Sequence, residues 1–166
     1  MNGMKVTAFN CPNCGAAFNP EKHKCDYCGS FIFLEDDKQF DVSENIIREI
    51  SNSQNSDVYV NGNLIGKGEI PLRIGLATYY PKFPFSYSNG KLTLTEKNLY
   101  FTSPKIILVQ DEASFKIPLS DVKDVTTALN LIVSQHILIH TDTQKFRFVV
   151  YGGNEWIRKI KNAAMI

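Results

Sequence analysis

The chain has 166 residues, of which 18 are Lys or Arg and 17 are Asp or Glu, so its formal charge is +1. With 43% hydrophobic residues it can bury a core, which excludes wholesale disorder. The near-neutral charge argues against a protein that mainly coats nucleic acid. No stretch approaches the ~20 apolar residues of a membrane span, and the first ten residues lack the apolar segment of a secretory signal. We therefore expect a soluble, cytoplasmic protein.

All four cysteines fall within the first 28 residues, as two C-x-x-C pairs that are each followed by glycine. A glycine at this position allows the tight turn that brings both sulfurs of a pair onto one ion. The alternatives fit less well, because a disulfide framework needs an oxidising compartment and a thioredoxin-type redox site needs only one pair. His23, between the pairs, is expected to be a solvated loop residue. The predicted metal ligands are Cys11, Cys14, Cys25 and Cys28.

A site of four thiolates is closed, so we expect a structural Zn²⁺ and no catalysis at the metal. The stretch 10–33 resembles the zinc-ribbon knuckles at the N-termini of many bacterial proteins, and we assign residues 1–35 to a small zinc ribbon. Such ribbons bind nucleic acid, bind proteins or hold a terminus together. The apolar surround of the ion is expected to come from Phe9, Phe18 and Phe31 or Phe33.

A short helix and a linker are predicted next, over residues 36–56. The helix is expected within 40–50, with Asp41 or Ser43 as its N-cap, because apolar residues recur there at helical spacing. The polar run 51–56 is typical of a linker or exposed loop. After it, Asn61–Gly62 lies between two extended runs and predicts a β-hairpin that opens the second domain. The apolar positions of the helix are Val42, Ile46, Ile47 and Ile50.

From residue 68 onward the apolar pattern mostly has the period of two that indicates β-strands. In 91–95, Leu92 and Leu94 are expected to face inward and the two threonines outward. A turn then leads into a strand over 99–102, and the chain ends in an amphipathic helix from about Asn154 with Trp156 as a core anchor. The fold class predicted is therefore mainly β (α+β). Further strands are expected at 106–109, 114–117, 131–133, 137–140 and 146–151.

Two segments of this body carry a family resemblance. Residues 90–101, Gly-Lys-Leu-Thr-Leu-Thr-Glu-Lys-Asn-Leu-Tyr-Phe, and 117–125, Ile-Pro-Leu-Ser-Asp-Val-Lys-Asp-Val, are similar to elements of pleckstrin-homology-type (PH-like) domains of the GRAM and bacterial PH-like kind. The resemblance spans roughly residues 68–164 and implies an antiparallel β-barrel capped by the C-terminal α-helix, to which we assign residues 57–166. It also implies binding of a protein or of an anionic lipid.

Residues 79–87, Tyr-Tyr-Pro-Lys-Phe-Pro-Phe-Ser-Tyr, depart from the family pattern. Because proline donates no hydrogen bond, this segment is not expected to form a regular ladder. It either packs as a loop over one end of the barrel or exposes an apolar patch that docks on a membrane or a protein. Lysines near the first strands, including Lys105, lack the density of a lipid site. The candidate ligand or partner surface comprises Tyr79, Tyr80, Phe83, Phe85, Lys91 and Lys97.

No pattern of an enzyme emerges from the sequence, and we expect none. His136 and His140 lie four apart on a predicted strand, about 13 Å from each other, which is too far for one ion, so they are interpreted as surface residues. The function predicted is a non-enzymatic zinc-binding adaptor. Its partner is expected to be a protein or a second copy of the chain, with an anionic lipid at the inner membrane face as the second option.

The alternative function is a nucleic-acid-binding factor that uses the zinc ribbon. Lys22, His23 and Lys24 would form a small basic tip between the knuckles, and Phe18 and Tyr27 could stack on bases. The acidic run 35–37 just downstream argues against this alternative, as does the lack of further cations.

Overall fold

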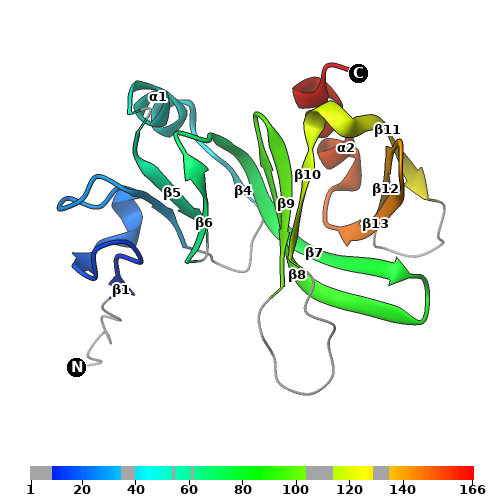
Figure 1. The fold of residues 1–166 in the computed structure, drawn as a ribbon, viewed down its shortest axis with the longest axis horizontal. Helices are drawn as coiled ribbons and strands as arrows, with labels where there is room; N and C mark the ends of the chain where they lie inside the picture. Colours follow the sequence, from blue (N-terminus) through cyan, green and yellow to red (C-terminus); the bar gives the residue numbers. More distant parts are fainter. Residues whose placement is uncertain (1–8, 35–39, 54, 61, 104–113, 129–134) are drawn as a thin grey trace, which may run out of the picture. The chain divides into compact units, whose positions relative to one another are not determined.

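The computed structural model describes residues 9–34, 40–53, 55–60, 62–103, 114–128 and 135–166. They belong to two compact units (Figure 1). The first comprises Met1–Asp36 and Ser43–Ile70, and the second Asp37–Val42 and Pro71–Ile166. This division differs from the predicted domain boundary at residue 56. Among the described residues, no helix is both long and apolar enough to cross a bilayer.

The first unit is built from short strands and one helix. Strands β1 (Phe9–Asn10) and β2 (Ala17–Phe18) pair in antiparallel fashion, and the 3₁₀ turn η1 (Pro20–Lys22) follows them. A second sheet has the order β3 (Phe31–Phe33), β5 (Asp57–Val60), β6 (Asn63–Lys67). Since β5 pairs in parallel with β3, the hairpin that was expected to open the second domain is part of the first unit.

The β5–β6 hairpin was predicted correctly from Asn61–Gly62. Gly62 has a φ of +76°, the left-handed region that a tight turn demands and glycine adopts without strain. Asn61 lies outside the described residues. The helix α1 (Glu44–Asn52) has Ser43 at its N-cap position. Of the two predicted N-caps, Asp41 and Ser43, the structure therefore selects Ser43, because Phe40–Asp41 forms strand β4, which pairs with β7 (Pro71–Lys82) of the second unit.

The second unit contains one eight-stranded sheet in which all described pairings are antiparallel (Figure 1). Its order is β10-β9-β8-β7-β13-β12-β11, with β4 also on β7. A meander of four strands is thus joined, through its first strand, to the last strand of a meander of three. The strands are β7 (Pro71–Lys82), β8 (Ser86–Thr95), β9 (Asn98–Thr102), β10 (Phe115–Pro118), β11 (Val122–Ala128), β12 (Gln135–Thr141) and β13 (Lys145–Val150), with the 3₁₀ turn η2 (Leu119–Asp121) between β10 and β11.

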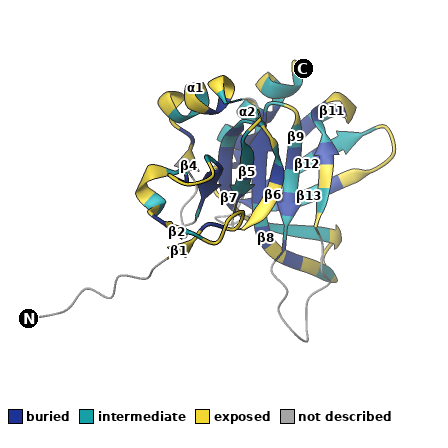
Figure 2. Ribbon diagram, turned by 60° about the vertical axis from the view of Figure 1, so that its left-hand side comes forward, coloured by how far each residue is buried: buried dark blue, intermediate teal, exposed yellow. Residues whose placement is uncertain are grey.

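The sheet curls around a single apolar core that the helix α2 (Gly153–Ala164) closes. Trp156 and Ile160 of α2 are fully buried in this core, together with side chains from β7 through β13. Figure 2 colours the ribbon of these elements by burial. Trp156 is therefore the core anchor that the sequence predicted. The sheet is an open half-barrel whose path ends at β10 and β11, whereas the sequence predicted a barrel.

The prediction that the two threonines of 91–95 face outward was wrong. Leu92 and Leu94 are buried as predicted, but Thr93 and Thr95 are buried too. The Thr95 hydroxyl accepts from the Asn98 amide at 2.9 Å and donates to the Asn98 carbonyl at 3.0 Å, so it lies inside the β8–β9 turn with its polar atom satisfied. The strands predicted at 106–109 and 131–133 lie outside the described residues.

Candidate metal centre and partner surface

The two C-x-x-C segments fold into the same tight turn. In each, the first cysteine donates its backbone N–H to the carbonyl five residues later, and the glycine four residues later donates back to that cysteine. Gly15 and Gly29 have φ values of +74° and +73°, so a glycine was needed at both positions. The four N···O distances are Cys11 to Ala16 2.8 Å, Gly15 to Cys11 2.8 Å, Cys25 to Ser30 2.9 Å and Gly29 to Cys25 3.0 Å.

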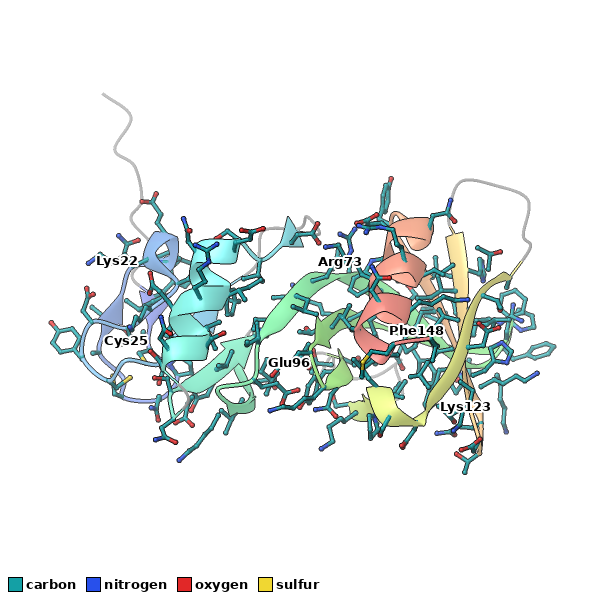
Figure 3. The ribbon with its side chains drawn as sticks, turned by 90° about the horizontal axis from the view of Figure 1, so that it is seen from above. Lys22, Cys25, Arg73, Glu96, Lys123 and Phe148 are labelled. Atoms are coloured by element: carbon teal, nitrogen blue, oxygen red, sulfur yellow. The ribbon has the colours of Figure 1, made fainter. Side chains whose placement is uncertain are left out.

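These turns bring the four predicted ligands together. The four Sγ atoms lie within 4.8 Å of one another (Figure 3, near Cys25). Cys11 Sγ is 3.5 Å from Cys28 Sγ, and Cys14 Sγ is 3.8 Å from Cys25 Sγ. In a tetrahedral site with Zn–S bonds of about 2.3 Å, neighbouring sulfurs are roughly 3.8 Å apart. The donor set therefore fits one tetrahedral metal ion, and the four cysteines could hold it.

Polar side chains connect the two turns behind the sulfurs. The Asn13 side-chain amide donates to Ser30 Oγ at 2.9 Å and lies 3.5 Å from Asp57 Oδ2 on β5. Ser30 Oγ in turn lies 3.3 Å from Cys28 Sγ. Ser30 is buried although it is polar. This chain of contacts fixes the second pair relative to the first and to the β5–β6 hairpin.

The thiols of Cys11, Cys14 and Cys28 have shifted pKa values. Burial raises the pKa of Cys28, but hydrogen bonds from the Ser30 side chain and backbone outweigh it and bring the pKa to about 6. A backbone hydrogen bond at Ala16 lowers the pKa of Cys14, whereas burial and the neighbouring thiols raise it to about 12. Burial also raises the pKa of Cys11. A bound cation would supply the positive charge that lets all four ionise together.

The apolar surround of the sulfurs was predicted only in part. Phe18 is buried there, and so is Ile32, with Tyr59 packed against them. Phe9, by contrast, is 40% exposed, although it pairs with the buried Phe18 in the β1–β2 sheet. His23 is not a solvated loop residue. Its ring stacks on Phe33 with 5.3 Å between centroids, and its Nδ1 is buried.

The expected basic tip does not form a free cationic surface. Lys22 Nζ lies 2.8 Å from Asp26 Oδ2, and Lys24 Nζ lies over the Phe31 ring at 5.2 Å from its centroid. Phe18 is buried, so its ring cannot stack on a base. Tyr27 is 77% exposed and is the predicted stacking residue that remains accessible.

The aromatic segment 79–87 forms the end of a β-hairpin, which corrects the expectation that it would not be a ladder. β7 continues to Lys82, and β8 starts at Ser86. The pairing shifts register between Tyr79 and Lys82, and this irregularity contains Pro81. A bulge leaves a residue unpaired, so a proline there costs no ladder hydrogen bond.

The aromatic side chains of this hairpin separate into two groups. Tyr79 points into the core, with its ring 4.8 Å from that of Phe115 and 5.3 Å from that of Phe148, so it is not a surface residue. Tyr80 is half-buried on the other face. Phe83 is 42% exposed, Phe85 91% and Tyr87 50%. Of the two interpretations of this segment, the exposed apolar patch therefore describes Phe83, Phe85 and Tyr87.

The two predicted surface lysines do not join one site. Lys91 is half-buried opposite Leu76, and desolvation lowers its pKa. Lys97 lies in the β8–β9 turn at the other end of β8, where its Nζ is 3.7 Å from Glu96 Oε1. Lys105 is outside the described residues. A cationic lipid site built from these lysines therefore finds no support in their placement.

Sequence analysis missed two residues that lie beside the exposed aromatics. His136 is buried, with its ring 5.6 Å from that of Phe83 and 6.3 Å from that of Tyr80. The Arg147 guanidinium carbon lies 4.5 Å from the Phe83 ring centroid. The interpretation of His136 as a surface residue was wrong. Only the sheet order, which places β13 between β7 and β12, brings these side chains to the hairpin.

No family model matches the sequence, and no curated protein matches it significantly. Solved structures do resemble it. The crystal structure of the C-terminal domain of an unknown protein from Leishmania infantum aligns with a TM-score of 0.50 at 14% identity, covering 74% of this chain and 98% of that one. The Vps36 N-terminal PH domain aligns with a TM-score of 0.48 at 13% identity, covering 68% and 87%. The DH/PH domains of p115-RhoGEF align with a TM-score of 0.45 at 13% identity, covering 58% and 31%.

The resemblance to the Leishmania domain shows that the arrangement of strands is a known fold. In the second unit, a four-strand meander is followed by a three-strand meander, and the first strand pairs with the last. A C-terminal helix then closes the core. The fold class is therefore the predicted one: a mainly β chain whose second unit is a curled antiparallel sheet of PH-like fold with a C-terminal helix.

Proposed function

We propose that this chain is a non-enzymatic adaptor: a structural zinc ion holds the N-terminal unit together, and the PH-like unit binds a protein partner. The observation that carries the proposal is the exposure of Phe83, Phe85 and Tyr87 on one hairpin. Large aromatic side chains that gather on a surface mark interaction sites in soluble domains, because burying them on binding is favourable.

The donor set of the metal centre supports the choice of zinc and of a structural role. Four thiolates in tetrahedral arrangement suit Zn²⁺ and leave no coordination position open for a substrate. Such a site requires reduced thiols, which agrees with a cytoplasmic location. The proposed ion would stabilise the segment around the cysteines, whose apolar cluster as described contains only Phe18 and Ile32 besides the buried Cys11 and Cys25.

A protein partner is favoured over an anionic lipid by the placement of the lysines. Lys97 lies near a carboxylate and Lys91 is half-buried, so neither offers the open cluster of cations that a lipid headgroup prefers. Nucleic acid is disfavoured by the ion pair of Lys22 and by the burial of Phe18. A second copy of the chain remains within the proposed class of partner.

Site-specific photocrosslinking in the native host tests the proposal. A photoreactive phenylalanine analogue replaces Phe85, and a matched variant carries it at the exposed Tyr27 of the first unit. We expect light-dependent protein adducts from position 85 and not from position 27. Mass spectrometry identifies the adduct, and light scattering of the purified chain distinguishes a second copy from another protein. Failure of position 85 to give any protein adduct would contradict the proposal.

A further inference from the structure

The four strands around the exposed hairpin have an unbalanced charge. As described, β7, β8, β12 and β13 contain no Asp or Glu, although the chain as a whole carries 17 acidic residues. Their cations are Arg73, which is buried against Asp41, and four others. This part of the sheet is therefore cationic within a nearly neutral chain. Apart from the buried Arg73, the cations of these four strands are Lys82, Lys91, Lys145 and Arg147.

Strand alternation sorts the side chains of this region onto two faces. Tyr79 of β7 and Phe148 of β13 face the core and stand opposite each other in the register. Their neighbours Tyr80 and Arg147 therefore lie on the outer face. On β12, Ile137 belongs to the core, which places His136 on the outer face as well.

Aromatic contacts organise this outer face around Tyr80. The Tyr80 ring centroid lies 5.3 Å from that of Phe83, 6.0 Å from that of Tyr87 and 6.3 Å from that of His136. Arg147 covers Phe83 from the neighbouring strand. Rings that contact one another in this way are held in place, so a partner would lose little side-chain entropy when it binds them. We call these five residues the aromatic-cationic face.

The exposed apolar surface continues along the strand. Leu76, on the same side of β7 as Tyr80, is 46% exposed. From Leu76 to Lys82 an extended strand covers about 20 Å. This elongated surface matches the length of an extended polypeptide segment of about six residues. The shape of the surface therefore favours a polypeptide over a membrane.

We propose that the aromatic-cationic face is the docking surface for an acidic, apolar segment of a partner protein. This inference rests on the proposed function and specifies the partner's chemistry. The apolar side chains of the segment pack on Tyr80, Phe83 and Tyr87. Its carboxylates pair with Arg147, whose planar guanidinium accommodates a carboxylate through two parallel hydrogen bonds, and with the exposed Lys82 at the hairpin end. The absence of acidic residues from the four described strands removes repulsion of such a segment.

Amide NMR of the full chain with two peptide mixtures tests this docking surface. The first mixture contains ten-residue peptides in which Asp or Glu alternates with Leu, Ile, Phe or Pro. The second replaces the acidic positions by Lys or Arg. We expect the acidic mixture to shift the amides of 79–88, 136–138 and 147–149, with an apparent affinity at least about tenfold above that of the basic mixture. Equal responses to both mixtures, or no shift in these segments, would overturn the inference.

Single substitutions test whether peptide binding depends on the aromatic-cationic face. Arg147→Gln should weaken binding of the acidic mixture by about tenfold or more, because it removes the charge-assisted hydrogen bonds to a carboxylate. Tyr87→Ser should also weaken binding of the acidic mixture, because it removes an exposed ring on which the apolar side chains of the peptide pack. The matched controls are Lys116→Gln, an exposed cation on β10, and Tyr27→Ser, an exposed aromatic of the first unit. Controls that lose as much affinity as Arg147→Gln would overturn the inference.

The outcomes distinguish this inference from the proposed function. Protein adducts at position 85 without any response to the acidic mixture would end the inference and leave the adaptor function standing. Vesicles of phosphatidylcholine and phosphatidylserine that broaden the same amides, with the same sensitivity to Arg147→Gln, would show a membrane contact and overturn it. Failure of both experiments would contradict the two proposals together.

Discussion

Arg73 places its guanidinium carbon 5.1 Å from the centroid of the Trp156 ring (Figure 3 labels Arg73). Its Nη1 also lies 2.6 Å from Asp41 Oδ1, and Lys159 Nζ lies 3.4 Å from the same oxygen. A buried cation is thus held between the face of an aromatic ring and a carboxylate. The three elements β4, β7 and α2 meet at this point of the PH-like unit.

Asp41→Ala is expected to destabilise the PH-like unit by about 2 kcal/mol, because it removes a carboxylate from a buried guanidinium. The half-exposed position of Asp41 keeps the loss below that of a fully buried pair. Trp156 is the single tryptophan of the chain, so its fluorescence during denaturant unfolding reports this unit. Asp142→Ala serves as the control, since its 3.1 Å ion pair with Lys123 is exposed and should contribute less than about 1 kcal/mol. Equal losses would contradict the prediction.

Removal of the metal is expected to unfold the first unit and to leave the second folded. Elemental analysis should find about one zinc per chain. Ser30→Ala should lower zinc affinity by about 10–100-fold, because the hydroxyl supports Cys28 from outside the ligand set. Cys25→Ser removes a ligand and should cost more. After chelation, the fluorescence of Trp156 should stay unchanged while NMR signals of 9–34 collapse to random-coil positions; signals that persist there would refute a metal-dependent fold.

Gly90→Ala is expected to disrupt the PH-like unit. A Cβ at this position would clash with the Thr102 carbonyl oxygen and lie 2.9 Å from Phe101 Cζ and 3.0 Å from Ser103 Cα. Two of these three atoms belong to the backbone and cannot move aside without breaking the β8–β9 pairing. We expect the Gly90→Ala protein to be insoluble on expression or to show a large loss of unfolding free energy in denaturant titration. Asn89→Ala, next to it and exposed, is the control; a stable Gly90→Ala protein would show that β9 can shift.

Tyr79→Ala and Phe85→Ser are expected to have opposite effects, although both residues belong to one aromatic segment. Tyr79 packs in the core, so its truncation should cost about 3–5 kcal/mol of stability. Phe85 is 91% exposed, and its change should stay within about 0.5 kcal/mol while weakening binding of the proposed protein partner. Thermal unfolding with both variants checks the difference. A destabilised Phe85→Ser would mean that the hairpin end is a packed loop.

Acid is expected to destabilise the PH-like unit through His136. Burial lowers the pKa of His136 in the folded chain, and the positive charge of Arg147 lowers it further. The unfolded chain, with a pKa near 6.5, then binds the proton more readily. The unfolding free energy should therefore fall as the pH drops below about 6.5 and become constant below the folded pKa. His136→Gln should remove this part of the pH dependence. Denaturant midpoints of the original chain and the variant, measured between pH 8 and 5, check this. If the midpoints of the two proteins fall in parallel as the pH drops, the prediction is wrong.

Local patterns predicted the features that depend on neighbouring residues. The spacing of the cysteines and of Gly15 and Gly29 sets the turns directly, so the four ligands could be named from the sequence. The same holds for the Gly62 turn and for the burial of Leu92 and Leu94, which follow from conformational freedom and alternation. Trp156 could be placed in the core because its helix shows a regular apolar face.

Features that depend on the order of strands could not be predicted. Nothing in 57–60 signals that β5 pairs in parallel with β3, so the hairpin was assigned to the wrong side of a boundary. The bulge that accommodates Pro81 comes from pairing with β8, not from the local sequence. His136 and Arg147 reach Phe83 only because β13 pairs with β7, which joins segments about 70 residues apart in the chain.

The assignment of β4 to the second unit has a consequence for any attempt to divide the protein. Residues 37–42 belong to the PH-like unit, yet the chain then returns to the first unit before it enters β7. A single proteolytic cut at residue 70 would leave β4 and the Asp41 carboxylate on the wrong fragment. On the ribosome, β4 emerges and must wait some seconds for its partner strand. The two units are thus interwoven in order of synthesis, and neither can be inherited, excised or transplanted whole as one continuous piece.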